Sequence, residues 1–510
     1  MRIAHHRRPW RAPRLGAALR ASVALLLCAC GVFGAGCGQR EEGTAGTAGQ
    51  SSAPGGFLWG TATAAHQVEG FNTSNDWYLW EMIPGKIRNG DVSGIAVDHY
   101  HRFDEDFALA AQMGHNAYRF SIEWSRIEPA RGHYDEEAIE HYHAVLDSLE
   151  RHRLRPVVTL HHFTHPQWVL NPLRPDKDLD GWSSDETVEA FVRFAAAMAK
   201  EFGRQVDYWV TINEPLVLVN YQYFQGGFPS NRGPLSLEEG RRAIFQLLKA
   251  HAAAYHAIHE ADVWDADGDG VSCLVSAAKH IRIMMPKDPG NPLDREGARQ
   301  VDYVFNQVFF DTLIDGFVDS DLDGRYGTPG ADPAEGYHAE MARTLDYIAL
   351  NYYSRDVVTG VPFLPYLHGI PEENPDPAVE HNEMGWEIYP RGLYEVLTRF
   401  GRYGLPVIVT ENGIPDAEDR LRPRFLIEHI EAMFEAMDEG IDVRGYLHWS
   451  LMDNFEWQDG FWPRFGLLAV EYPSLERTPR PSAFLYADII RSGRTGPRVR
   501  GLPALGPRER

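Results

Sequence analysis

Two glutamates stand where short apolar runs of the chain end, and together they could hydrolyse an acetal. Glu214 follows the run 209–212, and Glu411 follows the run 407–409. Hydrolysis of a glycosidic bond needs a proton donor for the departing oxygen and an electron-rich group, or an activated water, at the anomeric carbon. Two carboxyl groups supply both functions if one is protonated and the other is charged. A separation of about 5–5.5 Å would let the charged group attack the sugar directly.

Further polar and aromatic residues lie at the ends of other apolar runs. Because the carboxyl ends of barrel strands carry the catalytic groups of that fold, these residues are expected to surround the two glutamates. Buried polar groups are costly unless they have a partner or a task. A guanidinium lowers the pKa of a neighbouring carboxyl, so Arg119 is expected to keep the attacking glutamate charged. The residues at these ends include His66, Gln67, Arg119, His161, His162, Asn351, Tyr353 and Trp449.

The elements that would position these residues alternate along the chain. Strand-like runs followed by amphipathic helical stretches predict parallel strands joined by helices. Eight such runs in one long segment favour a closed barrel, and no glycine-rich dinucleotide fingerprint follows the first run. We therefore predict an α/β protein with a single (β/α)8 TIM barrel over residues 57–490. The runs are 57–61, 116–121, 156–160, 209–212, 272–277, 347–350, 407–409 and 443–447, and the helical stretches are 136–151, 185–202, 238–259, 295–314, 391–403 and 424–437.

The strand ends are embedded in longer motifs. These are FLWGTATAAHQVEG (57–70), RFSIEWSRIEP (119–129), TINEP (211–215), MGWEIYPRGL (384–393), VTENG (409–413) and GYLHWSLMDNFEWQDGFWPRFGL (445–467). In order and spacing they resemble glycoside hydrolase family 1, the β-glucosidase family, over roughly residues 57–490. The resemblance implies a β-glycosidase that retains anomeric configuration and requires no cofactor.

Carried over position by position, the resemblance also implies a role for each site residue. Glu214 would be the acid/base and Glu411 the nucleophile, with Tyr353 orienting it and Arg119 and Asn351 beside it. Asn213 would bind the sugar 2-hydroxyl. The outer hydroxyls would be held by Gln67, His162, Glu456 and Trp457, while Trp449 would lie under the ring and Phe465 would form a wall.

The substrate is expected to be a small neutral β-linked saccharide or an aryl glucoside. The family's 6-phosphosugar branch replaces the acid at 456, whereas Glu456 is present here, and a carboxylate would repel a phosphate. The third strand departs from the family pattern, because it reads His161-His162-Phe163-Thr164. The preference among β-glucosides, β-galactosides and β-fucosides therefore stays open. A net charge of −23 argues against nucleic acid as a partner.

Two alternative functions were weighed against hydrolysis. A transglycosylase would form the same covalent intermediate and pass the sugar to another acceptor. A non-catalytic, lipid-anchored sugar-binding protein would typically lack one of the two glutamates, and both are present. An enzyme is therefore favoured over a binding protein, whereas the sequence does not separate hydrolysis from transfer, and the oligomeric state stays open.

The N-terminal segment indicates export. Arginines precede an apolar run over residues 21–33 that is short for a membrane-spanning helix, as in a signal peptide (1–37). The sequence around Cys30 resembles a bacterial lipobox, with Leu27 three residues before it, and Cys37 is a second candidate for lipid attachment. A Gly/Thr/Ala/Ser linker (38–56) follows, and residues 491–510 are expected to be a disordered tail. The protein is predicted to be a membrane-anchored lipoprotein or, alternatively, a soluble secreted enzyme.

Alternating aspartates open a sequence that is similar to a calcium-binding loop. Asp265, Asp267 and Asp269 are followed by Gly270, and a second run, 319–324, has the same spacing. Carboxylates at alternate positions before a glycine can wrap a hard cation, although neither run has a glutamate at the twelfth position. The sequence leaves open a structural calcium ion and a plain acidic turn.

Overall fold

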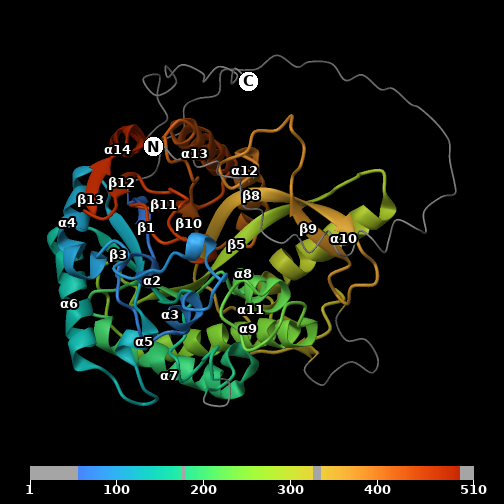
Figure 1. Ribbon diagram of the computed structural model, residues 1–510, viewed down its shortest axis with the longest axis horizontal. Coiled ribbons are helices and arrows are strands. Elements are labelled where there is room, and N and C mark those ends of the chain that lie inside the picture. Colours follow the sequence, from blue (N-terminus) through green and yellow to red (C-terminus); the bar gives the residue numbers. More distant parts are fainter. Residues whose placement is uncertain (1–55, 175–177, 326–334, 494–510) are drawn as a thin grey trace, which may run out of the picture. The chain divides into compact units, whose positions relative to one another are not determined.

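The structure, a computed structural model, describes residues 56–174, 178–325 and 335–493 (Figure 1). At its centre lies a nine-stranded sheet in which all strands except β9 are parallel. The remaining eight close into a ring, because β8 pairs with β10 as well as with β5. The predicted (β/α)8 barrel is confirmed. The ring consists of β1(Leu58–Ala62), β2(Ala117–Ser121), β3(Arg155–His161), β4(Tyr208–Asn213), β5(Leu274–Pro286), β8(Ile348–Gly360), β10(Val407–Asn412) and β11(Val443–Trp449).

Helices cover the ring from outside because each has one apolar face and a polar start. α6(Glu136–Arg151) and α7(Asp185–Phe202) begin and end where the sequence predicted. Their first turns are capped by Asp135 and Ser184, whose side chains accept backbone N–H groups that have no partner within the helix. The other helices of eight or more residues are α4(His99–Gln112), α9(Leu237–Ala261), α10(Pro292–Asp302), α12(Arg391–Gly401), α13(Arg422–Asp438) and α14(Pro481–Ser492).

Short elements fill the loops between the strands and helices of the barrel. Two small antiparallel pairs, β6–β7 and β12–β13, lie outside the ring. The short helices are α2(Ala65–Val68), α3(Asp76–Glu81), α5(Trp124–Ile127), α8(Pro215–Val219) and α11(Val308–Leu313), and the short strands are β6(Phe317–Val318), β7(Gly336–Tyr337), β12(Leu468–Glu471) and β13(Glu476–Pro479).

Two of the barrel strands are much longer than predicted. The sequence ended the fifth and sixth runs at residues 277 and 350, but β5 and β8 each extend over 13 residues. Beyond the ring they stay paired, and β9(Gly369–Glu373) adds to β8 in antiparallel orientation (Figure 1). The single helix predicted over 295–314 is instead α10, a π-helical turn and α11, since the wider turn η4(Tyr303–Gln307) interrupts the α-helical hydrogen bonding.

The last helix, α14, forms hydrogen bonds with the first and last strands of the ring, β1 and β11. The Tyr486 hydroxyl of α14 lies 2.9 Å from the carbonyl oxygen of Gly60 in β1 and 3.1 Å from that of Tyr446 in β11. α14 ends at Ser492, two residues beyond the predicted boundary of the barrel. The predicted signal peptide with its cysteines, the linker up to residue 55 and the tail from residue 494 lie outside the described residues. Within the described ranges, no helix is long and apolar enough to cross a membrane.

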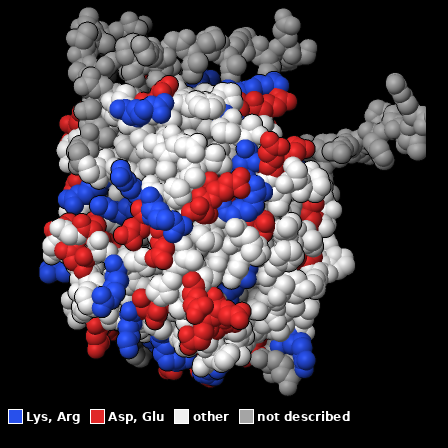
Figure 2. Space-filling model, turned by 90° about the vertical axis from the view of Figure 1, so that its left-hand side faces the viewer, with Lys and Arg blue, Asp and Glu red and all other residues white. Residues whose placement is uncertain are grey.

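Charged side chains of both signs are interspersed over the surface. The face in Figure 2, which looks onto the left-hand side of Figure 1, shows red and blue groups side by side. Ion pairs explain some of this mixing: Arg151 of α6 lies 2.8 Å from Asp104 of α4, and Arg102 lies 2.8 Å from Glu105. Such exposed pairs contribute little to stability, with a median of about 0–1 kcal/mol.

Candidate active site

Both predicted catalytic glutamates lie at the carboxyl ends of barrel strands. Glu214 follows β4 directly, and Glu411 is the last residue but one of β10. Their side chains are buried, because Glu214 is 6% and Glu411 3% exposed. The backbone of Glu214 is left-handed (φ 48°, ψ 58°), and Pro215 begins α8 immediately after it. An L-residue takes this conformation only when its surroundings enforce it, as they often do at functional sites.

Glu411 is held by groups from two other strands. Arg119 of β2 donates through Nη1 to its Oε1 at 2.5 Å, and the Tyr353 hydroxyl of β8 donates to its Oε2 at 2.7 Å. Arg119 is itself fixed, because its Nε donates to the Thr159 hydroxyl at 3.0 Å and its Nη2 to Asn213 Oδ1 at 2.7 Å. The guanidinium therefore lies between one glutamate and the residue next to the other.

Glu214 has a different set of neighbours. Asn351 of β8 donates through Nδ2 to its Oε1 at 2.8 Å, and Nδ1 of His280 lies 3.4 Å from the same oxygen. Asn351 is oriented by the Thr410 hydroxyl, which donates to its Oδ1 at 2.7 Å. No guanidinium or ammonium group of the described residues forms an ion pair with Glu214.

The two glutamates titrate as a pair because both are buried and repel each other. Burial raises the pKa of Glu411, and despite Arg119 the charge of Glu214 helps to bring it to about 7. Burial also acts against ionisation of Glu214, but His280 and Asn351 lower its pKa to about 2. That lowering relies on a charged imidazole, and burial lowers the pKa of His280 below its usual value. When His280 is neutral, Arg119 is still charged beside Glu411, so the shared proton belongs on Glu214.

The protonation expected from the sequence, a neutral Glu214 and a charged Glu411, depends on more groups than Arg119. The pKa of Glu411 is raised by burial, and the charge of an ionised Glu214 raises it as well. Two buried carboxylates cannot both be charged cheaply, so the state of one depends on the other. His280, which the motifs did not single out, contacts Glu214 and affects which glutamate keeps the proton.

Three flat side chains line the site almost in parallel. The ring of His162 lies 6.0 Å from those of Trp449 and Trp457, with interplanar angles of 19° and 17°. Asn213 Nδ2 lies 3.2 Å from His162 Nε2, and burial lowers the pKa of His162 well below its usual range. His162 is therefore a neutral acceptor, and Phe163 packs edge-on against Trp457 at 5.4 Å.

Residues that follow the first and last strands of the ring contact one another at the site. Gln67 Nε2 donates to Asn454 Oδ1 at 3.0 Å and to the carbonyl oxygen of Phe455 at 2.9 Å. Glu456 accepts from Trp449 Nε1 at 3.2 Å, and burial raises the pKa of Glu456 to about 8. This acid is therefore protonated at neutral pH, whereas the argument from the sequence took it to be a carboxylate.

The fold brings every sequence-predicted catalytic and sugar-binding residue to the same end of the barrel. Phe465 completes the set, since its ring centre lies 6.3 Å from that of Tyr353. Three residues that contact this group were not predicted from the sequence: Thr159, His280 and Thr410. A period-two alternation would have found His280, because Ser276, Ala278 and His280 lie on one face of β5.

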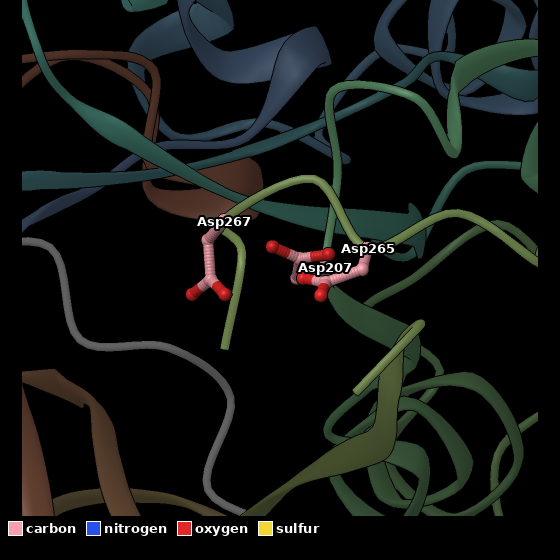
Figure 3. A group of neighbouring side chains, drawn as sticks. All are labelled: Asp207, Asp265 and Asp267. Carbon is pink, nitrogen blue, oxygen red and sulfur yellow. The ribbon is translucent and has the colours of Figure 1, made fainter. Parts of the chain in front are cut away.

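The aspartate-rich loop forms a cluster that differs from the predicted one. Asp265 and Asp267 lie together with Asp207 from the loop before β4, and carboxylate oxygens of the three are within 4.8 Å of one another (Figure 3). Asp269, which the sequence grouped with them, turns its carboxylate to the backbone N–H of Val271 instead. Asp265 accepts backbone N–H groups of the loop, and Asp267 lies 3.0 Å from Arg155. This cluster lies at the amino-terminal end of the strands, away from the glutamates.

Comparison of the sequence with known proteins identifies the family to which this site belongs. Residues 50–495 match the sequence profile of glycosyl hydrolase family 1. The chain belongs to this family. It is therefore a glycoside hydrolase, and the family resemblance inferred from its motifs is confirmed.

Relatives of this family 1 hydrolase share its length as well as its sequence. It is 32% identical to a β-galactosidase of Pyrococcus woesei, over 85% of this chain and 96% of the relative. It is 33% identical to a bifunctional β-D-glucosidase/β-D-fucosidase of Bifidobacterium breve, over 86% of this chain and 98% of the relative. Among solved structures, it is similar to a β-glycosidase from Pyrococcus horikoshii with a TM-score of 0.77 and 34% identity, covering 89% and 99% of the two chains.

Proposed function

We propose that this family 1 hydrolase is a retaining β-glycosidase that cleaves non-phosphorylated β-glucosides, with β-galactosides and β-fucosides as further substrates. The observation that carries the proposal is the unequal surroundings of two buried glutamates. Arg119 and Tyr353 stabilise a charged Glu411. The side chains in direct contact with Glu214, those of Asn351 and His280, are both neutral when His280 is unprotonated. A charged nucleophile opposite a protonated acid is the arrangement that the reaction needs.

The proposed reaction has two steps. In the first, Glu411 attacks the anomeric carbon while Glu214 transfers its proton to the departing oxygen, which takes the electrons of the broken bond. In the second, the Glu214 carboxylate removes a proton from water as the water oxygen attacks the same carbon and releases Glu411. Two inversions give net retention.

The surrounding residues are proposed to hold the sugar. Asn213 has an amide fixed between Arg119 and His162, so it is oriented to meet a hydroxyl close to the reacting carbon. Hydrogen bonds at the 2-hydroxyl strengthen in the transition state, which makes this position valuable. The indole of Trp449 offers a flat surface for the apolar face of a pyranose. Gln67, His162, Glu456 and Trp457 are proposed to hold the outer hydroxyls, and Phe465 is proposed to form the wall.

The preference for an unphosphorylated sugar has a revised physical basis. The sequence argument relied on charge repulsion by Glu456, but the raised pKa of this group leaves it uncharged at neutral pH. A protonated, buried carboxyl donates one hydrogen bond and accepts others, as a sugar hydroxyl requires. It offers no positive charge to a phosphate, whose desolvation would then be uncompensated.

A panel of nitrophenyl glycosides, assayed with the wild type and with Glu411→Ala, tests this function. We expect the highest kcat/KM with β-glucoside, near-complete loss in the variant, and β-glucose as the first-formed product by NMR. Persistent activity in the variant, or release of α-glucose first, would refute the assignment. Activity on a 6-phosphoglucoside but not on the plain glucoside would overturn the substrate class. Adding an acceptor alcohol and analysing the products separates hydrolysis from transglycosylation.

We also propose that the protein is exported and anchored through an acylated cysteine, either Cys30 or Cys37. The support is the lipobox-like sequence and the linker that follows it. Labelled palmitate should be incorporated into the wild type in a bacterial host and lost in one of the variants Cys30→Ser or Cys37→Ser. Labelling that survives in the double variant would contradict this.

Calcium binding at the aspartate cluster is retained as a proposal for a structural ion, with no role in the reaction. Its support is three close carboxylates, one of which, Asp207, has its pKa raised to about 6 by burial and by its neighbours. A divalent cation would relieve that repulsion. Chelation should lower the melting temperature of the wild type more than that of Asp265→Asn. Identical melting with and without chelator would argue against the ion.

A further inference from the structure

His280 is a buried imidazole at the reacting end of β5. Its side chain is 5% exposed, and its Nδ1 lies 3.4 Å from Glu214 Oε1. The ring packs edge-on against Tyr353 at 5.5 Å and against Phe305 at 6.1 Å. Neither ring nitrogen has a formed hydrogen bond among the residues that the structure describes, so the 3.4 Å approach of Nδ1 to Glu214 leaves room for the contact to tighten.

Packing alone is a poor explanation for this histidine. Burying a polar group without a full set of hydrogen bonds costs free energy, and an apolar side chain would fill the space between two aromatic rings without that cost. The imidazole instead lies with Nδ1 3.4 Å from Oε1 of Glu214, the same oxygen that accepts from the Asn351 amide at 2.8 Å. Its position suggests a task that involves this carboxyl.

The charged and titratable groups around His280 come from several strands. Glu214 at the end of β4 favours a positive imidazole, while Lys279 and Arg282 of β5 and burial itself disfavour it. Tyr353 of β8 packs edge-on against the imidazole with ring centres 5.5 Å apart. His162, the residue after β3, also acts on Glu214, and its pKa is lowered by burial. The imidazole is therefore neutral at neutral pH and contacts Glu214 as a hydrogen-bonding group.

We propose that His280 is a positioning residue for the acid/base: its Nδ1–H donates to Oε1 of Glu214 and stabilises the carboxylate form that the second half of the reaction uses as a base. The inference rests on the proposed function. In the first step Glu214 gives its proton to the departing oxygen and becomes the carboxylate. His280 then keeps this carboxylate aimed at the incoming water while its own proton stays on Nδ1. When Glu214 takes the proton of that water, the contact weakens again.

The sign of the expected effect follows from this contact. A donor to the charged form of an acid lowers its pKa, so removing the donor raises it. In kcat/KM for a β-glucoside with a poor leaving group, activity falls at alkaline pH when Glu214 loses its proton. Without His280, that alkaline limb should move to higher pH. A purely structural role would lower activity without moving the limb.

The test compares pH profiles of His280→Phe and His280→Gln with the wild type, using an alkyl β-glucoside. His280→Phe keeps a ring between Tyr353 and Phe305 but has no nitrogen, and its alkaline limb should move up by about 1 pH unit. His280→Gln keeps an N–H donor and should move it by less than half as much. With a dinitrophenyl glucoside, which leaves without a proton, deglycosylation by His280→Phe should slow several-fold at acidic pH because the base is more often protonated.

His115 provides a matched control. It is also a buried histidine whose ring nitrogens have no partner among the described residues, and it stands two residues before β2, at the end of the barrel opposite to the glutamates. His115→Phe should leave both limbs where they are.

The outcomes separate this inference from the proposed function. An alkaline limb of His280→Phe that stays in place or moves to lower pH overturns the inference. If the wild type cleaves no β-glycoside, the proposed function itself has failed. Should His280→Phe not fold by its melting curve, His280→Leu replaces it under the same criterion.

Discussion

Glu411 and Glu214 carry the same carboxyl group, but the barrel gives them opposite surroundings. Glu411 sits between a guanidinium and a phenol that both donate to it, and the guanidinium is charged at every working pH. Glu214 meets an amide and an imidazole, and the imidazole can lose its charge. The comparison shows that the neighbouring side chains, and not the carboxyl groups themselves, distinguish Glu411 from Glu214. Replacing a neighbour of one glutamate should therefore shift the pKa of that glutamate more than the pKa of the other.

The largest effect is expected from Glu411→Ala, which removes the proposed nucleophile. The kcat/KM for an aryl β-glucoside should fall by on the order of 10⁴-fold or more, because no group replaces the covalent step. Azide should enter the vacated space, attack from the side of the lost carboxylate and give the α-glucosyl azide, which NMR identifies. A β-glucosyl azide from this variant would mean that the two glutamates have exchanged roles.

Glu214→Ala should show a smaller and substrate-dependent loss. With an alkyl glucoside kcat/KM should fall by about 10²–10⁴-fold, the range that general acid catalysis supplies. With a dinitrophenyl glucoside the first step needs no proton, so a burst of phenol should persist in stopped-flow traces. Azide should here give the β-glucosyl azide. Equal losses with both leaving groups would contradict the assignment of Glu214 as the acid/base.

Tyr353→Phe sharpens the comparison from the side of Glu411. The lost hydroxyl donates to the carboxylate, so its removal raises the pKa of Glu411, and the acidic limb of kcat/KM should move to higher pH by about 1 unit. The alkaline limb, which belongs to Glu214, should stay in place. Tyr352→Phe is the matched control, because its hydroxyl donates to the carbonyl of Tyr389 and not to either glutamate. A shift of the alkaline limb alone in Tyr353→Phe would assign the limbs the other way round.

Glu456→Gln should have the smallest effect at neutral pH. The pKa of Glu456 is raised to about 8 by burial, so glutamine replaces a carboxyl that is already neutral and KM should change by less than about tenfold. Above pH 8 the wild type gains a charge there, and its KM should vary with pH while that of the variant does not. A large loss at pH 7 would show that Glu456 acts as a carboxylate after all.

Much of the fold and site follows from sequence patterns that depend on local structure. The alternation of runs predicted the barrel, and the caps before Glu136 and Asp185 set two helices to the residue. β5 was ended early because Lys279 interrupts its apolar run. In the structure that lysine is buried outside the ring with its Nζ 4.3 Å from the centre of the Phe305 ring, so the strand continues through it to His280. A cation–π contact between segments that are distant in the sequence produces no periodic pattern of residues, so it cannot be predicted from the sequence.

The composition of the first aspartate cluster differs from the prediction for a related reason, because Asp207 takes the place of Asp269. The sequence grouped neighbours along the chain, whereas the third carboxylate comes from Asp207, almost 60 residues before the loop, through the hydrogen bond of its Oδ1 with the Ala266 N–H. The spacing of residues along the chain cannot predict which side chains the closing of the barrel brings together. The same holds for Thr159 and Thr410, whose hydroxyls orient charged and amide groups on other strands.

The contact between Gln67 and Phe455 spans 388 positions of the chain. Since the proposed sugar contacts join Gln67, just after the first strand, to Glu456 and Trp457 beyond the last, a chain that lacks either end loses part of these contacts and should bind its substrate weakly. Full activity is therefore expected only when the whole chain is present and the ring of strands has closed. Two separately expressed halves, split in an exposed loop on the far side, would regain activity only upon reassociation, which makes this barrel suited to serve as a sensor of chain complementation.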